Sequence, residues 1–234
     1  MVSVGVEWIN NFPEPCDQPE LSYCDDTSVG FYNGMVSRGH GGSFNWGNSN
    51  AWERDFRDSV FGGDDHNWID NVDFAHFSSH GSCSVNNVYR GYFGGQVDNC
   101  TWQSDRARLG NQNLEWLALD TCNSLELTRN IISVWHNAFD RLHMILGFTD
   151  LVSDSSTTAS RGYNFGRRAG NNDKLADAWL DECYSFWADD NPVAMTSGRS
   201  RDDAIYRRDN ERIYSNFSDI PHNEISWYAW KWRS

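Results

Sequence analysis

The chain has 234 residues, a length that suits one large domain able to bury its own hydrophobic core. Phe, Trp and Tyr make up 15% of the residues, which is too much apolar aromatic surface for a disordered chain. The 33 acidic and 19 basic residues give a net charge of −14, so we expect no nucleic-acid partner, because phosphate backbones are also negative.

Strands and helices are predicted in alternation along most of the chain. In the first part they are, in chain order, a strand at 2–9, a helix at 27–36, a short strand at 44–46, a helix at 51–59 and a strand at 72–78. Loops rich in Pro, Asp, Gly or Asn connect them, and a long loop with short strands is expected at 82–113.

The second part continues the alternation. It predicts a strand at 114–120, a helix at 124–139, a strand at 142–148, a helix at 175–188, a strand at 192–196 and an aromatic strand at 225–232. Polar composition predicts loops at 150–171 and 197–221. This order favours an α/β three-layer sandwich with a mostly parallel central sheet flanked by helices. We expect a single domain over 1–234, with 197–234 as a C-terminal extension packed on it.

Six cysteines are present, and none forms the CxxC spacing of a zinc knuckle or a thioredoxin-like site. Two pairs flank short loops and are candidates for disulfides in an oxidising compartment, namely Cys16 with Cys24 and Cys83 with Cys100. Cys122 and Cys183 are then the expected free thiols.

The expected location follows from short signals. Sequons at Asn99 and Asn216 fit a secreted protein. The chain opens without a basic and apolar signal segment, so secretion would follow removal of a leader. No run of 18 apolar residues is present, so we expect no membrane span.

Two predicted strands end on reactive residues, at the edge of an α/β sheet where ligands bind. One strand leads to His80-Gly81, and the other leads through Asp120 to Cys122. A cysteine and a histidine placed in this way suit nucleophilic catalysis, in which the thiolate attacks a carbonyl and the imidazole moves the proton. Because Gly81 has no side chain, its N–H can approach a developing oxyanion. The helix expected after Cys122 would lower the pKa of the thiol through its N-terminal dipole.

These residues resemble a known family. The stretches FAHFSSHG at 74–81 and LEWLALDTC at 114–122 resemble the two signature blocks of caspase-like cysteine peptidases, which include caspases, metacaspases, legumains, gingipains and separases. The order of His before Cys agrees, and the resemblance extends over 2–196. Stretches around 46–56 and 146–148 are also similar to a bacterial family related to these peptidases.

The resemblance implies roles for individual residues. Cys122 would be the nucleophile, His80 the general acid and base, and the N–H groups of Gly81 and Cys122 the oxyanion hole. In metacaspase-like members, the acid two residues before the cysteine lines the pocket for a basic side chain at P1, the substrate residue before the scissile bond. Asp120 holds that place here. One departure is that Asn123 follows the cysteine, where many members carry a Ser-Gly pair.

The implied activity is therefore that of a cysteine peptidase acting on a peptide or protein through a thioacyl-enzyme, with no cofactor and no metal. Alternatives are a transpeptidase or cyclase of the same chemistry, a non-catalytic peptide- or ligand-binding member, and a carbohydrate-binding protein that uses surface Trp.

Other conspicuous groups have structural interpretations. Asp120 is alternatively a cap of the following helix, and His76 is expected to point into the packing of its strand. The glycine-rich segment 38–42 is expected to be a mobile loop or a rim of the active site. The turn with Asp64, Asp65 and Asp70 is expected to be solvated or to bind a cation. The Trp-rich stretch Trp227–Trp232 is expected to form an edge of the core or a surface on which a ligand stacks.

Overall fold

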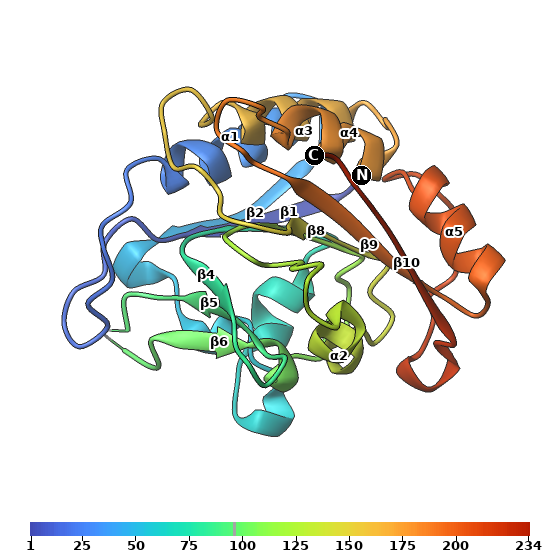
Figure 1. Cartoon of the computed structure of the whole chain (residues 1–234), viewed down its shortest axis with the longest axis horizontal. Coiled ribbons are helices and arrows are strands. Elements are labelled where there is room, and N and C mark those ends of the chain that lie inside the picture. Colours follow the sequence, from blue (N-terminus) through green and yellow to red (C-terminus); the bar gives the residue numbers. More distant parts are fainter. Residues whose placement is uncertain (96) are drawn as a thin grey trace.

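A seven-stranded sheet forms the centre of the molecule in the computed structural model, which describes residues 1–95 and 97–234. Its strand order is β10-β9-β8-β7-β3-β1-β2 (Figure 1). The strands are β1 (Ser3–Trp8), β2 (Gly41–Gly47), β3 (Phe74–Ser78), β7 (Trp116–Asp120), β8 (Met144–Phe148), β9 (Pro192–Gly198) and β10 (Trp227–Trp232). All seven overlap strands predicted from the sequence.

Five of these strands run parallel. β1 pairs in parallel with β2 and β3, β3 with β7, and β7 with β8, whereas β9 is antiparallel to both β8 and β10. Every residue of β3, β7, β8 and β9 is buried, which explains why they are near-continuous apolar runs. The α/β class and the mostly parallel sheet are thus confirmed.

One face of the sheet, here called the helical face, is covered by four helices (Figure 1). They are α1 (Cys24–Val36), α3 (Arg161–Gly170), α4 (Leu175–Cys183) and α5 (Arg201–Asn210). α1 and α3 meet at backbone distance. A Cβ on Gly34 would lie 2.7 Å from the Tyr163 carbonyl oxygen, and one on Gly162 would lie 1.9 Å from that of Thr27.

The opposite face, here called the mixed face, is covered by a small antiparallel sheet, short turns and one short helix (Figure 1). The small sheet has the order β4 (Gly81–Cys83), β5 (Tyr89–Tyr92) and β6 (Thr101–Gln103), and the helix is α2 (Ile131–Trp135). The 3-10 turns of the chain are Asn48–Asn50, Glu53–Asp55, Ser59–Phe61, Asp65–Asn67, Ile69–Asn71, Ser104–Arg106, His136–Ala138 and His222–Glu224. The expected layer of helices on this second face is therefore replaced mainly by strands and turns, packed around large buried aromatic side chains such as Trp102 and Phe56.

The helix predictions were less accurate than the strand predictions. The helix expected at 51–59 consists of 3-10 turns, and the one expected at 124–139 shrinks to α2 and a following 3-10 turn. Helices α3 and α5 form where loops were predicted, because packing of a buried face, rather than intrinsic propensity, supplies most helix stability in proteins. Residues 197–234, expected to be an extension packed on the domain, contribute α5 and the edge strand β10 of the main sheet.

The disulfide prediction was wrong in its pairing. Cys16 is bonded to Cys100, 84 residues later, with the two Cα atoms 5.3 Å apart. The other two predicted partners are free thiols, Cys24 in the first turn of α1 and Cys83 in the segment that precedes Cys100. Cys122 and Cys183 are free, as expected. Among the described residues, no helix is long and apolar enough to cross a membrane.

Candidate active site

The two strands that lead to His80 and Cys122 are neighbours in the sheet. β3 and β7 are paired in parallel with a constant offset of 42 residues, as in Ser78 opposite Asp120. The backbone contact continues past the strand ends, where the Ser79 N–H donates to the Asp120 carbonyl at 3.4 Å. His80 and Cys122 have the same offset, and both line one pocket, here called the strand-end pocket. The structure thus brings together the two residues that the sequence singled out.

A backbone carbonyl orients the His80 ring. Its Nε2 lies 2.8 Å from the Pro19 carbonyl oxygen, and the ring stands 5.0 Å from that of Phe12, centroid to centroid. Since a carbonyl oxygen only accepts, Nε2 must carry the proton, which leaves a lone pair on Nδ1 in the neutral ring. Nδ1 is therefore the nitrogen that can act as a base.

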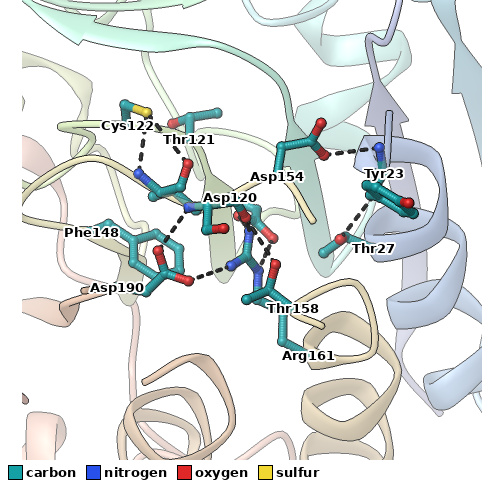
Figure 2. Close-up of polar contacts among 12 residues, drawn as sticks. Tyr23, Thr27, Asp120, Thr121, Cys122, Phe148, Asp154, Thr158, Arg161 and Asp190 are labelled. Carbon is teal, nitrogen blue, oxygen red and sulfur yellow. Dashed lines mark hydrogen bonds and ion pairs between the residues drawn. The ribbon is translucent and has the colours of Figure 1, made fainter. Parts of the chain in front are cut away.

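Cys122 is a partly buried thiol. Its Sγ accepts a hydrogen bond from the Val152 N–H at 3.3 Å, and its distance to the Val152 carbonyl oxygen is 4.0 Å (Figure 2). Burial raises the pKa of this thiol, and the negative charges of Asp120 and Asp190 raise it further, whereas the Val152 bond lowers it. The expected lowering by a helix dipole was wrong, because residues 121–130 form turns and α2 begins only at Ile131.

Gly81 lies against the backbone of the cysteine segment. A Cβ at this position would approach the Cys122 carbonyl oxygen to 2.5 Å, so a side chain is excluded. Tyr92 donates its N–H to the His80 carbonyl at 3.1 Å, which makes these two residues a hydrogen-bonded pair. In an antiparallel ladder the next pair is not hydrogen-bonded, so the Gly81 N–H points away from its β5 partner and is free of the ladder.

Asp120 is held by a cation from the same chain. Its two oxygens accept hydrogen bonds from Nε and Nη2 of Arg161 at 2.7 and 2.6 Å, and Arg161 also donates to Asp190 at 3.0 Å (Figure 2). Asp120 and Arg161 are both buried. The cap role is wrong, since no helix follows directly. The role as selector of a basic P1 side chain is weakened, because the arginine already neutralises this carboxylate.

Asp154 forms another wall of the strand-end pocket. Its oxygens accept hydrogen bonds from the Ser22 N–H at 2.5 Å and from the Tyr23 N–H at 2.9 Å, the second of which is drawn in Figure 2. Within residues 1–95 and 97–234, no Lys or Arg forms an ion pair with Asp154. It is therefore a carboxylate whose charge is not cancelled by a neighbouring cation.

Three participants escaped the sequence reasoning. Arg161 and Asp154 fall in a polar segment predicted to be a loop, and neither belongs to a recognisable motif. The contribution of Pro19 is a backbone carbonyl, which leaves no signal in its residue type. Each of them depends on tertiary contacts between distant segments.

The other conspicuous residues lie elsewhere. His76 is fully buried, bonded to the Ser28 hydroxyl at 3.0 Å, and burial lowers its pKa to about 3, as its packing role predicts. The loop 38–42 lies beside the amino end of β1, where His40 accepts a hydrogen bond from the Val2 N–H at 3.3 Å. The strand-end pocket is at the carboxyl ends of the strands, so this loop does not rim it.

Asp65 and Asp70 are buried rather than solvated. The stretch Trp227–Trp232 forms the edge strand β10, as its interpretation as a core edge predicts.

The comparisons with known proteins assign a family and no activity. No curated protein matches the chain. A family model described as a domain of unknown function, DUF6345, matches residues 6–234. Because this match spans nearly the whole sequence, the chain belongs to the DUF6345 family.

Proposed function

We propose that this protein is a cysteine peptidase of the caspase-like superfamily, with Cys122 as nucleophile and His80 as general acid and base. The observation that carries the proposal is the placement of both residues on one pocket, at the carboxyl ends of two adjacent parallel strands. The hydrogen bond from His80 to the Pro19 carbonyl supports it, because a third group that orients the base is the usual companion of a nucleophile–base pair.

The chemistry proceeds in two balanced steps. Nδ1 of His80 takes the proton of the Cys122 thiol, and the sulfur forms a bond to the carbonyl carbon of the substrate. The carbon–nitrogen bond then breaks, and the amine leaves with the proton from His80. Water gives a proton to the same nitrogen and attacks the thioester, which releases the acid and restores the thiol. The Gly81 N–H is available to stabilise the oxyanion in both steps.

The raised pKa of Cys122 shapes this mechanism. In the free protein the sulfur of Cys122 is mainly the neutral thiol. We therefore expect no thiolate–imidazolium ion pair between Cys122 and His80 before substrate binds. Proton transfer to His80 instead accompanies attack on a bound carbonyl, whose developing negative charge is stabilised at the same time. Reactivity toward a substrate-like electrophile should therefore exceed reactivity toward a small alkylating agent.

The pocket favours a peptide with a basic P1 side chain, now through Asp154 rather than Asp120. Asp154 lines the strand-end pocket, and backbone N–H donors rather than cations hold it. A guanidinium or ammonium group can bind the remaining lone pairs of this carboxylate. Asp120 lines the same pocket, and its proposed role is to hold Arg161 in place through their hydrogen bonds.

A peptide library tests the activity. The wild-type protein should hydrolyse members with Arg or Lys at P1, and Cys122→Ala and His80→Ala should each reduce the rate by a factor of at least 100. Cys83→Ser is the matched control, because this free thiol lies outside the pocket and should leave the rate unchanged. Hydrolysis that survives Cys122→Ala would contradict the proposal.

A labelling experiment separates the peptidase from a non-catalytic relative. A peptidyl acyloxymethyl ketone with Lys at P1 should modify Cys122 at pH 7, and His80→Ala should abolish that reaction. Iodoacetamide should react slowly at pH 7 and faster as the pH rises above 9, because burial raises the pKa of the thiol. Equal labelling of wild type and His80→Ala by the ketone would indicate a binding protein without a working dyad.

The same probes test the role of Asp154. Asp154→Asn should reduce the preference for the ketone with Lys at P1 but should leave the labelling by a neutral analogue unchanged.

A further inference from the structure

A second group of chemically active side chains lies at the amino ends of the central strands, opposite the end that carries the strand-end pocket. Glu115 directly precedes β7, His143 directly precedes β8, and Glu211 directly follows α5. One potential ligand atom from each of the three residues lies within 4.8 Å of the other two. The strand-end pocket is at the carboxyl ends of the strands, so this cluster belongs to a different part of the molecule.

Glu211 is the central and most unusual member. Its side chain is completely buried. One oxygen, Oε1, accepts hydrogen bonds from Nε1 of Trp116 at 3.2 Å and is 2.9 Å from Nδ1 of His143. The other oxygen, Oε2, is buried and has no hydrogen-bond partner in the described part of the chain. A buried carboxylate oxygen without a partner carries a large desolvation cost, so a bound group is the expected compensation.

The ring of His143 is arranged as in a metal-ligating histidine. Nδ1 faces two carboxylates, at 2.9 Å from Glu211 Oε1 and 3.9 Å from Glu115 Oε2. Nε2 lies 3.3 Å from Asp219 Oδ1, on the far side of the ring. A histidine that binds a metal through one nitrogen commonly donates its other N–H to a carboxylate, which fixes the ring.

The charge and spacing of the cluster favour a divalent ion. Three acidic side chains, Glu115, Glu211 and Asp219, surround a single histidine, so the cluster has more acidic than basic groups. In a tetrahedral site with metal–ligand bonds of about 2.0–2.1 Å, ligand atoms are about 3.4 Å apart. The separations from Nδ1 of 2.9 and 3.9 Å lie on either side of that value.

We propose that Glu115, His143 and Glu211 form a binding site for a divalent transition-metal ion, with Zn²⁺ as the best fit, and that Asp219 is a positioning residue for His143. The mixed nitrogen and oxygen ligands suit Zn²⁺, whereas Ca²⁺ and Mg²⁺ prefer oxygen ligands alone. The ion would connect β7 and β8 to the segment after α5, so its expected role is to fasten the C-terminal part of the chain to the sheet.

Metal titration of the full chain tests the site. Protein stripped with a chelator should bind one equivalent of Zn²⁺, and also of Co²⁺, and its melting temperature should rise. The experiment uses a Cys122→Ser background, so that the thiol of the strand-end pocket does not contribute. Bound Co²⁺ should show d–d absorption without a thiolate charge-transfer band, because none of the proposed ligands is sulfur.

Variants connect the binding to these residues. Glu115→Gln should weaken Zn²⁺ binding at least tenfold and should fold normally, since this side chain is 37% exposed. Asp219→Asn should weaken binding about tenfold, as expected for a group that orients a ligand. The exposed Glu14→Gln is the matched control and should bind as well as wild type. The proposal fails if no equivalent is bound, if Glu115→Gln binds like the control, or if Co²⁺ shows thiolate absorption.

Discussion

Buried carboxylates on the two faces of the main sheet are stabilised in different ways. On the helical face, Asp120 and Asp190 share one arginine, Arg161, which donates three hydrogen bonds to them at 2.6–3.0 Å. There a single cation in fixed geometry offsets the negative charge of both carboxylates in part. Arginine suits this position, because its planar donors match a carboxylate and it stays charged when buried.

On the mixed face, buried carboxylates face one another instead. Burial raises the pKa of Asp55, Asp65 and Asp70 to about 7 each. Burial and the neighbouring Asp55 raise the pKa of Glu7 well above its ordinary value. The oxygens of Glu7 are buried, and a hydrogen bond between Glu7 and Asp55 requires a proton on one of the two carboxyl groups. These groups are neutralised by protons rather than by a cation. The comparison shows that one fold uses both solutions. Burial also raises the pKa of Asp190 to about 6, so the proton-based solution differs in having several carboxyl groups that titrate near neutrality with no arginine between them.

The largest expected effect comes from removing the cation. Arg161→Met should lower the free energy of unfolding by about 3–5 kcal/mol, because it leaves two buried carboxylates uncompensated. Urea denaturation at pH 7 measures the change. Arg168→Met, on the same helix, is the matched control. That arginine pairs with three acids at the surface, so its loss should cost only about 0–1 kcal/mol. Equal losses in the two variants would remove the distinction between buried and surface pairs.

The difference between these regions also explains what the sequence could predict. The strands were predictable because runs such as 116–120 are buried on both faces and are apolar up to their last residue. The placement of His80 and Cys122 on one pocket was predictable too, since each follows such a run and parallel strands align their ends. The pairing of Asp120 with Arg161 was not, because the two lie 41 residues apart and only the docking of α3 joins them.

Helix α3 itself shows why the rest was missed. Its sequence RGYNFGRRAG contains three glycines, which disfavour a helix in isolation. In the folded protein, Gly162 and Gly166 are where the helix touches the backbone of α1, so the residues that weaken the local signal allow the tertiary contact. Packing that involves two distant segments cannot be detected from either segment alone.

The second expected effect is a pH dependence to which the mixed face contributes several buried carboxyl groups. In the unfolded chain, Asp55, Asp65 and Asp70 lose their protons near pH 4, whereas in the folded protein they keep them until about pH 7. The folded state therefore binds more protons between these values, and the free energy of unfolding should fall as the pH rises from about 4 to about 7. Above about pH 7 the fall should become shallower, because most of these groups have then lost their protons in the folded protein as well. Thermal and urea denaturation between pH 4 and 8 measure the curve.

A single substitution sharpens this test. Asp55→Asn removes one titrating carboxyl and supplies an amide that can donate to Glu7, so the variant should be more stable than wild type at pH 8, by roughly 1–3 kcal/mol. At pH 4.5 the gain should disappear, because Asp55 is already protonated there. The exposed Asp105→Asn is the control and should shift neither value. A gain that is the same at both pH values would show that Asp55 does not titrate as described.

The smallest expected effect returns to the helical face. Asp190 accepts hydrogen bonds from Arg161 at 3.0 Å and from the Ser153 N–H at 2.7 Å, and its charge is one of the causes that raise the pKa of Cys122. Asp190→Asn should cost only about 1 kcal/mol, since Arg161 keeps both bonds to Asp120.

The same substitution should make the thiol more reactive. Removing a nearby negative charge favours the thiolate, so the pKa of Cys122 should fall, and iodoacetamide should alkylate it faster at pH 8 than in wild type. The neighbouring Asp189→Asn changes the net charge equally but lies exposed at the surface, so it should leave the rate nearly unchanged. If both variants accelerate alkylation to the same extent, the effect comes from overall charge. If only Asp190→Asn does, the arginine-centred cluster that stabilises the helical face also holds Cys122 in its thiol form.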